Sequence, residues 1–212
     1  MGSFAPEYLA LPSDVIVTPM KDHQRYFPVV NQEGELLPHF IAVRNGTADH
    51  LDLVRAGNEK VLRARLADAR FFFEEDQKAT LADRVQRLRH IVFQENLGTL
   101  YNKTERLTAL TKFLAGQVGL DETATSFVER AALLAKADLT TNMVNEFPEL
   151  QGVMGREYAL LSGEHTTVAQ AIAEQYLPRF AGDELPATLS GALLALSDKM
   201  DTTVGSFGVG LV

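Results

Sequence analysis

The amino-acid sequence predicts a mainly helical α+β protein, and three observations lead to this class. In the first part of the chain, short apolar runs flank a polar loop that contains a glycine, which is typical of a β-hairpin. From about residue 49 onward, apolar residues recur at helical spacing. Of the 212 residues, 46% are hydrophobic and 23% are charged, as in ordinary globular proteins. We therefore expect an α+β part over residues 4–97, an all-helical part over 98–204 and a truncated, glycine-rich tail over 205–212.

The strand signals lie in the first part of the chain. Val15–Thr18 is a short β-branched run that we interpret as a strand. Tyr26–Val30 and Leu36–Val43 flank the polar loop Asn31–Glu35, and this arrangement predicts a hairpin. Arg44–Thr47 has turn composition and is expected to close the unit.

Basic side chains gather in two places in this α+β part. Met20–Arg25 is a dense polar run, which a solvated loop also explains. In the helical pattern that follows, five basic residues stand against two acidic ones between Arg55 and Arg70. In a protein of net charge −8, such a helix indicates either a contact with a phosphate backbone or a salt-bridged surface. The sequence leaves both interpretations open.

The helical part is divided by cap signals. Asn102, Asp121 and Thr167 are expected to cap three helices, and Val153–Leu161 has the apolar spacing of another. Pro186 is expected in the first turn of the last helix, because proline is tolerated where the amide has no helical partner.

The stretch Phe127–Pro148 places three apolar residues and Asp138 on one helical face. A buried carboxylate needs a partner, because an isolated buried charge is costly. Asp138 is therefore either hydrogen-bonded to local donors or the remnant of a metal or phosphate site. Asp198 and Asp201 are the other acids expected near this core, and so few carboxylates rarely suffice for Mg²⁺ or Mn²⁺.

Composition excludes several function classes. There is no cysteine, so disulfides, thiolate nucleophiles and Cys-ligated zinc are excluded within this sequence. No apolar run approaches the roughly 20 residues that span a bilayer. The net charge of −8 argues against a general nucleic-acid coat. Phosphate-binding glycine motifs and histidine pairs at metal-binding spacing are also missing.

The helical part resembles the domain of the HD superfamily, whose pattern is H…HD…D across packed helices. Ala131–Leu139 (AALLAKADL) is similar to that family's AALLHDIG-type helix, with Asp138 at its Asp and Ala137 in place of its His. Asp198 matches the final Asp, and Lys103 stands where the first His is expected. The resemblance implies an HD-like scaffold that lacks two metal-binding histidines, so we expect no metal site.

Longer strings resemble the β subunit of bacterial two-subunit glycyl-tRNA synthetase. In chain order they are MKDHQRYFPV from Met20, LLPHFIAVRNG from Leu36, GNEKVLRARLADARFFFEED from Gly57, NMVNEFPELQGVMG from Asn142 and YLPRFAGDELP from Tyr176. Several long strings in the right order are more specific than any single motif. The resemblance implies a middle fragment of that subunit.

This resemblance also implies a function in the cytoplasm without contact to a membrane. In the α₂β₂ assembly, the α subunit carries the class II active site, which uses ATP, Mg²⁺ and glycine. The β subunit supports tRNA binding and assembly with the α subunit. The expected partners are therefore tRNA(Gly) and the α subunit, with no catalytic residue and no cofactor in this chain.

Basic and amide side chains of the α+β part are the expected tRNA contacts, because such groups bind phosphates. They are Lys21, His23, Arg25, Arg44, Asn45, Asn58, Lys60, Arg63 and Arg65. Two alternatives remain open. One is an HD-type phosphohydrolase that uses Asp138 and Asp198, and the other is a purely structural interaction module.

Overall fold

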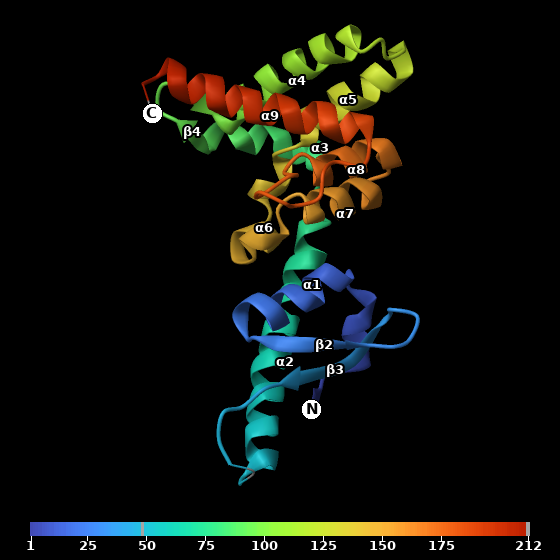
Figure 1. Ribbon diagram of the computed structural model, residues 1–212, viewed down its shortest axis with the longest axis vertical. Coiled ribbons are helices and arrows are strands. Elements are labelled where there is room, and N and C mark those ends of the chain that lie inside the picture. The colour runs from blue at the N-terminus through green and yellow to red at the C-terminus, as the bar shows by residue number, and fades with distance from the viewer. Residues whose placement is uncertain (48, 211–212) are drawn as a thin grey trace. The chain divides into compact units, whose positions relative to one another are not determined.

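The computed structural model describes residues 1–47 and 49–210, and these form two compact units (Figure 1). The first unit consists of Met1–Asp76 and Glu146–Leu150, and the second of Gln77–Asn145 and the chain from Gln151 onward. The sequence placed the boundary after residue 97 instead. Residues 77–97 join the helical unit because their helical turns and a short hairpin pack against the helix that begins at Leu100.

A three-stranded antiparallel sheet of order β1–β3–β2 forms the β part of the first unit. Its strands are β1 Gly2–Ser3, β2 Tyr26–Val30 and β3 Leu36–Ala42. The predicted hairpin is confirmed, with Tyr26 opposite Ala42 in the register. In its loop, Asn31 Oδ1 accepts hydrogen bonds from the amides of Glu33 and Glu35 at 3.1 and 2.8 Å.

The strand expected at Val15–Thr18 is wrong. These residues lie in α1, Ser13–Thr18, which follows a 3₁₀ turn at Pro6–Ala10 and continues into a π-helical turn at Pro19–His23. Val15 and Ile16 are almost completely buried. Tertiary burial of this short run therefore decides its conformation, since β propensity depends strongly on context.

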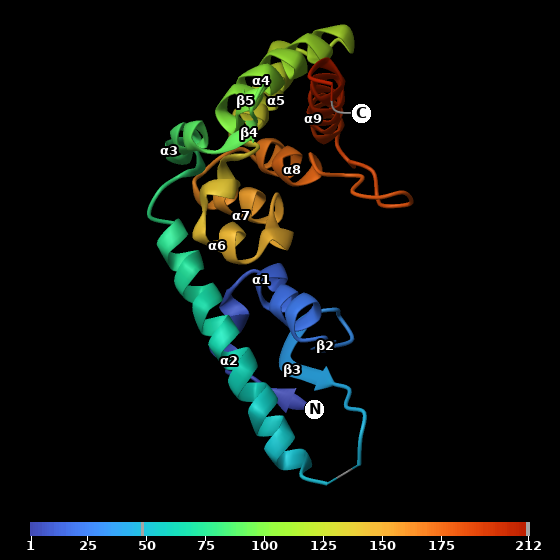
Figure 2. The same ribbon diagram turned by 90° about the vertical axis from the view of Figure 1, so that its left-hand side faces the viewer.

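The long basic helix is confirmed as α2, Leu51–Asp76. Its buried stripe contains Leu62, Leu66 and Ala69, which follow one another at the spacing of a single helical face. This face packs against β1, α1 and the π-helical turn, and Figure 2 shows α2 running beside them. The opposite side of α2 is left to solvent.

The second unit is helical. Its helices are α3 Leu81–Arg84, α4 Leu100–Gln117, α5 Glu122–Leu134, α6 Asn142–Glu146, α7 Val153–Leu161, α8 Thr166–Glu174 and α9 Leu189–Gly208. α6 ends at the first residue assigned to the other unit. Residues 85–90, 137–140 and 148–150 form 3₁₀ turns, the last of them in the first unit, and β4 Val92–Gln94 pairs with β5 Gly98–Thr99. The core forms where α5 and α9 pack against α4 and α8.

Two of the predicted caps in this unit are displaced. Asp121 caps α5 as expected, but α4 is capped by Thr99, and Asn102 is the reciprocal residue of that capping box. Likewise, α8 is capped by His165, whose Nδ1 accepts from the amide of Thr167 at 3.2 Å. Both helices therefore begin earlier than predicted, α4 at Leu100 and α8 at Thr166.

The last helix also differs from expectation. α9 begins at Leu189, after the cap residue Thr188, so Pro186 precedes the helix. The tail expected over 205–212 is helical as far as Gly208, and its last two residues lie outside the described part of the chain.

Candidate RNA-contacting surface and buried charge centre

The basic side chains of α2 divide into two groups. Arg65 Nη1 lies 3.1 Å from Glu146 Oε1, and Arg55 and Arg70 form ion pairs with Asp52 and Glu7. Lys60 and Arg63 are exposed and have no ion-pair partner among the described residues. The two interpretations of this helix therefore apply to different residues: part of it is a salt-bridged surface, and Lys60 and Arg63 remain available to a ligand.

The polar run before the hairpin forms the π-helical turn and the residues after it. Lys21 and Arg25 are exposed, and Arg25 has a positive φ of 57°. His23 is half-buried, packs edge-on against Phe147 at a centroid distance of 5.5 Å, and its Nε2 lies 3.9 Å from Glu149 Oε2. Lys21 and Arg25 are therefore open to a ligand, whereas His23 is engaged within the unit.

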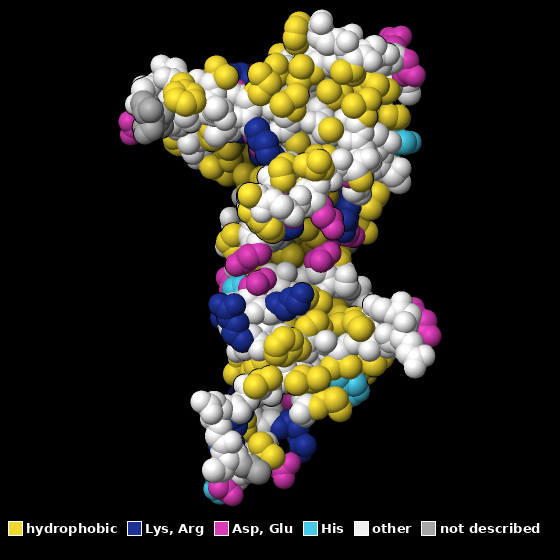
Figure 3. Space-filling view, in the orientation of Figure 1, with side chains coloured by type: hydrophobic (Ala, Val, Ile, Leu, Met, Phe, Trp, Pro, Cys, Tyr) yellow, Lys and Arg dark blue, Asp and Glu magenta, His cyan; other side chains and the backbone are white. Residues whose placement is uncertain are grey.

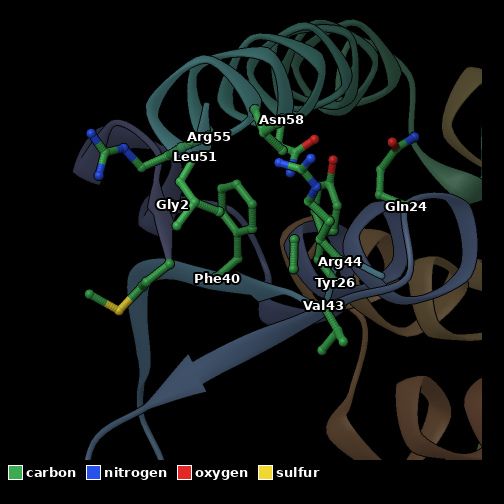
Figure 4. A pocket seen from close by; sticks show the side chains of 12 residues that line it. Gly2, Gln24, Tyr26, Phe40, Val43, Arg44, Leu51, Arg55 and Asn58 are labelled. Carbon is green, nitrogen blue, oxygen red and sulfur yellow. The ribbon is translucent and has the colours of Figure 1, made fainter. Parts of the chain in front are cut away.

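A cavity of about 520 Å³ lies between the sheet and α2 of the first unit. It is lined by Met1, Gly2, Gln24, Tyr26, Phe40, Ala42, Val43, Arg44, Leu51, Val54, Arg55 and Asn58. Figure 4 shows the side chains of Arg44 and Asn58 reaching into the same part of it. Two of the expected RNA-binding residues are thus brought together, while Asn45 is exposed in the adjoining loop.

Polar atoms in this cavity have unused hydrogen-bonding capacity. Arg44 Nη1 donates to the carbonyl of Asp49 at 3.0 Å, which fixes one end of the guanidinium. Within the described residues, the side-chain amides of Gln24 and Asn58 and the hydroxyl of Tyr26 have no hydrogen-bond partner. Burial raises the pKa of Tyr26, so its hydroxyl remains a donor at neutral pH. The cavity therefore offers amide, hydroxyl and guanidinium groups beside the apolar ring of Phe40.

A buried charge centre lies in the second unit, where α4 meets α9. Lys103 of α4 is buried, and its Nζ lies 2.9 Å from Asp198 Oδ1 and 3.0 Å from Asp201 Oδ2. The same ammonium donates to Thr202 Oγ1 at 2.8 Å. Lys103, expected at a vestigial histidine position, thus makes three short contacts with α9.

A second ammonium completes this centre. Lys136, between α5 and the 3₁₀ turn, is buried, and its Nζ lies 2.7 Å from Asp198 Oδ2 and 4.3 Å from the centre of the Tyr176 ring. Burial acts to raise the pKa of Asp198, but Lys136 and Lys103 outweigh it and hold that pKa below its ordinary value. Both oxygens of Asp198 are therefore occupied by cations of the protein itself.

Arg106 extends the centre toward the surface. Its Nε and Nη2 lie 2.6 and 3.2 Å from the two oxygens of Asp201, and its Nη1 donates to the carbonyl of Leu97 at 2.9 Å. This two-point contact is the strong geometry for a guanidinium and a carboxylate.

Asp138 lies near these ion pairs but forms none itself with the residues that the structure describes. The helix expected to carry it ends at Leu134, and the residue sits in the 3₁₀ turn Ala137–Thr140, with Ala137 and Asp138 fully buried. Its Oδ2 accepts from the amide of Gly152 at 2.6 Å, and its Oδ1 has no hydrogen-bond partner among the described residues. Burial raises the pKa of Asp138 to about 6. Asp138 therefore anchors the start of α7.

The arrangement is that of a neutralised salt-bridge cluster. Three cations (Lys103, Lys136, Arg106) face two ion-paired acids, with Asp138 nearby. The part of the chain that the structure describes contains no group of three or more His, Asp or Glu side chains that could hold a metal ion. A divalent cation at Asp198 would have to displace two ammonium groups.

Sequence reasoning missed Lys136 and Arg106. A signal for Lys136 was present, because a lysine inside the apolar run AALLAKADL is buried only if it has an acidic partner. Arg106 gave no such signal, since its partner lies 95 residues away along the chain.

No helix in the described residues is long and apolar enough to cross a membrane.

The comparisons with known proteins agree over the whole chain. A family model described as glycyl-tRNA synthetase beta subunit matches residues 1–212. A glycine–tRNA ligase beta subunit of Desulforudis audaxviator is 60% identical over 210 residues, which are 99% of this chain and 30% of the relative. That of Moorella thermoacetica is 57% identical over 211 residues, covering 100% of this chain and 30% of the relative. The chain thus spans about 30% of the length of these curated relatives.

Proposed function

The chain belongs to the family of glycyl-tRNA synthetase beta subunits, and we propose that it supports tRNA binding and assembly with a catalytic α subunit in the ATP-dependent glycylation of tRNA. The match of the whole chain to that family carries this proposal. ATP and Mg²⁺ belong to the α subunit in this scheme, and this chain contributes no catalytic residue. The assembly works in the cytoplasm.

The exposed cations of the first unit are the proposed phosphate contacts. Lys21, Arg25, Lys60 and Arg63 combine exposure with the absence of an ion-pair partner in the described chain, so binding a phosphate breaks no internal pair. Phosphate contacts of this kind position RNA without reading its sequence. Arg65 and His23 are weaker candidates, because each already faces a glutamate.

The cavity near Arg44 is proposed to take one unpaired nucleotide of the tRNA. The guanidinium of Arg44 can bind a phosphate, and the side-chain amides of Gln24 and Asn58 can form hydrogen bonds with the edge of a base. The volume of about 520 Å³ leaves room for a ligand of that size.

The geometry argues against an HD-type phosphohydrolase. Such an enzyme needs a metal at Asp198, where Lys103 and Lys136 already neutralise the carboxylate. Metal analysis of the purified chain distinguishes a phosphohydrolase from the proposed function. Stoichiometric Mn²⁺, Zn²⁺ or Fe that remains bound after dialysis would support the phosphohydrolase.

A purely structural role is favoured by one observation, namely that Arg55, Arg65 and Arg70 are paired internally. In that role, α2 packs within its own subunit or contacts another subunit, and the chain does not bind RNA.

Binding of the chain to a glycine tRNA transcript tests the proposal, with an unrelated tRNA as competitor and salt as the variable. We expect binding that weakens steeply as salt increases, because phosphate contacts release counterions. Absence of binding at low salt, together with association with the α subunit that responds to salt, would support the structural role instead.

A further inference from the structure

Helix α9 carries more apolar side chains than its unit buries. Leu193 and Leu194 are buried where α9 packs against α4, α5 and α8. Other large hydrophobic side chains, on the side of the helix that adjoins this contact, remain exposed. They are Leu189 at 52%, Leu196 at 47%, Met200 at 43%, Val204 at 65% and Phe207 at 64% of their full exposure.

These five residues form a single stripe, which we call the α9 stripe. They follow one another at intervals of seven, four, four and three residues, and this spacing keeps side chains on one side of a helix. The stripe runs from the first to nearly the last residue of α9 and is interrupted one turn after Leu189, where Leu193 is buried. In Figure 3, hydrophobic side chains are visible on the part of the surface where Figure 1 shows α9.

Exposed apolar residues that share one side of a helix differ from scattered ones. Single apolar side chains are normal on a protein surface, whereas contiguous patches usually mark a contact. A spacing of three, four and seven residues also specifies the shape of the contact, because it matches the ridge that a second helix covers in helix–helix packing. The best fit is therefore an amphipathic helix lying along α9.

We propose that the α9 stripe is covered, in the full-length β subunit, by a helix of the same polypeptide that lies outside residues 1–212. More than two thirds of each curated relative lies outside the region that matches this chain. A segment on the same polypeptide is present at a high effective concentration, so it outcompetes a separate molecule for the same apolar face.

Thiol labelling tests this directly, because residues 1–212 contain no cysteine. Leu196→Cys and Val204→Cys are made separately in the 212-residue chain and in a full-length β subunit whose other cysteines are replaced. Ala109→Cys, an exposed position of α4, is the matched control. We expect maleimide to label both stripe positions at least about tenfold more slowly in the full-length subunit than in the short chain, since thiol reactivity requires access. The control is expected to label at the same rate in both.

Equal labelling rates at the stripe in the two proteins would overturn the proposal. Protection that appears only after the α subunit is added would assign the stripe to that subunit instead. Protection of the short chain that increases with its own concentration would assign it to a second copy.

Charge insertion provides an independent readout. Leu196→Glu/Met200→Glu is expected to leave the melting temperature of the short chain nearly unchanged, because both side chains are about half exposed there. In the full-length subunit the same pair is expected to lower the melting temperature clearly, whereas Ala109→Glu is not. Equal shifts for the two variants in the full-length subunit would contradict a buried stripe.

Discussion

The Nζ atom of Lys136 lies 2.7 Å from Oδ2 of Asp198, although 62 residues separate them along the chain. Lys136 immediately precedes the Ala137–Asp138 pair, which is where the HD resemblance places a histidine and an aspartate. A lysine one residue away thus provides the positive charge next to Asp198. Both side chains are largely buried, so this ion pair links the end of α5 to α9 inside the helical unit.

Replacing Lys136 tests how much this ion pair contributes to the free energy of unfolding. Lys136→Met leaves Asp198 with Lys103 alone, and removing one partner of a buried carboxylate is strongly destabilising. We expect the free energy of unfolding to fall by roughly 3 kcal/mol, measured by urea denaturation.

The matched control is Lys112→Met, because Lys112 forms an exposed ion pair with Glu129 at 2.9 Å. Exposed pairs contribute at most about 1 kcal/mol, so this variant should unfold close to the parent. Similar decreases for the two variants would mean that Lys136 contributes nothing beyond a surface pair.

The raised pKa of Asp138 predicts that the stability of the folded protein falls as the pH rises. Its pKa is raised by burial from 3.8 to about 6, so between these values the folded protein binds more protons than the unfolded one. Its stabilising contribution is therefore full below pH 3.8 and is lost as the pH rises through about 6. The loss amounts to roughly 3 kcal/mol at most.

Asp138→Asn removes this titration while its side-chain oxygen can still accept from Gly152. Relative to the variant, the parent is expected to lose stability between pH 4 and pH 7.5, measured as the difference between their urea midpoints. Asp198 and Asp201 have lowered pKa values, so their contributions are lost at acid pH in both proteins and cancel. Parallel pH profiles would show that Asp138 remains ionised in the folded protein.

Gly191 leaves room for the side chain of Glu174, which binds Thr188 at the start of α9. Glu174 Oε2 accepts hydrogen bonds from the amide and hydroxyl of Thr188 at 3.2 and 2.6 Å, and a Cβ atom at position 191 would collide with the Glu174 side chain. Gly191→Ala should therefore lower the free energy of unfolding by about 1–3 kcal/mol.

Gly116 in α4 is the matched position, since a Cβ atom there would meet nothing within 4 Å. Gly116→Ala is expected to raise the free energy of unfolding by about 0.5–1 kcal/mol through helix propensity. Thermal or urea unfolding of the two variants measures both effects, and a stabilising Gly191→Ala would show that Glu174 relocates freely.

Reversing the charges of Lys60 and Arg63 in α2 should weaken RNA binding without affecting the fold. Lys60→Glu/Arg63→Glu is expected to weaken glycine tRNA binding and to reduce the slope of log affinity against log salt by about 1 for each phosphate that the variant no longer neutralises. The fold should be unaffected, because both side chains lack an ion-pair partner in the described chain.

Arg70→Glu serves as the comparison, because Arg70 is paired with Glu7 at 3.0 Å. It should disturb that pair and leave the salt slope unchanged. A normal salt slope in the Lys60/Arg63 variant would remove this part of α2 from the RNA surface.

Local sequence signals predicted the elements whose stabilisation is mostly local. The hairpin of β2 and β3 follows from two apolar runs around a polar loop, and α2, α5 and α7 follow from apolar spacing and, for α5, from its cap. Val15–Thr18 was misassigned because a four-residue apolar run fits a strand and a buried helical turn equally well. The division after Asp76 was also missed, because it depends on which unit the short segments pack against.

The sequence by itself determined the fold class, the family and the presence of Asp138 and Asp198 in one helical core, because periodicity, caps and long matching strings are local properties. Only the tertiary structure decided the partners of the charges. It brought Lys136 and Lys103 to Asp198, left Asp138 with the amide of Gly152, and separated the paired arginines of α2 from exposed Lys60 and Arg63. Ion pairs act over a few ångströms in space, so residues distant in the chain determine them.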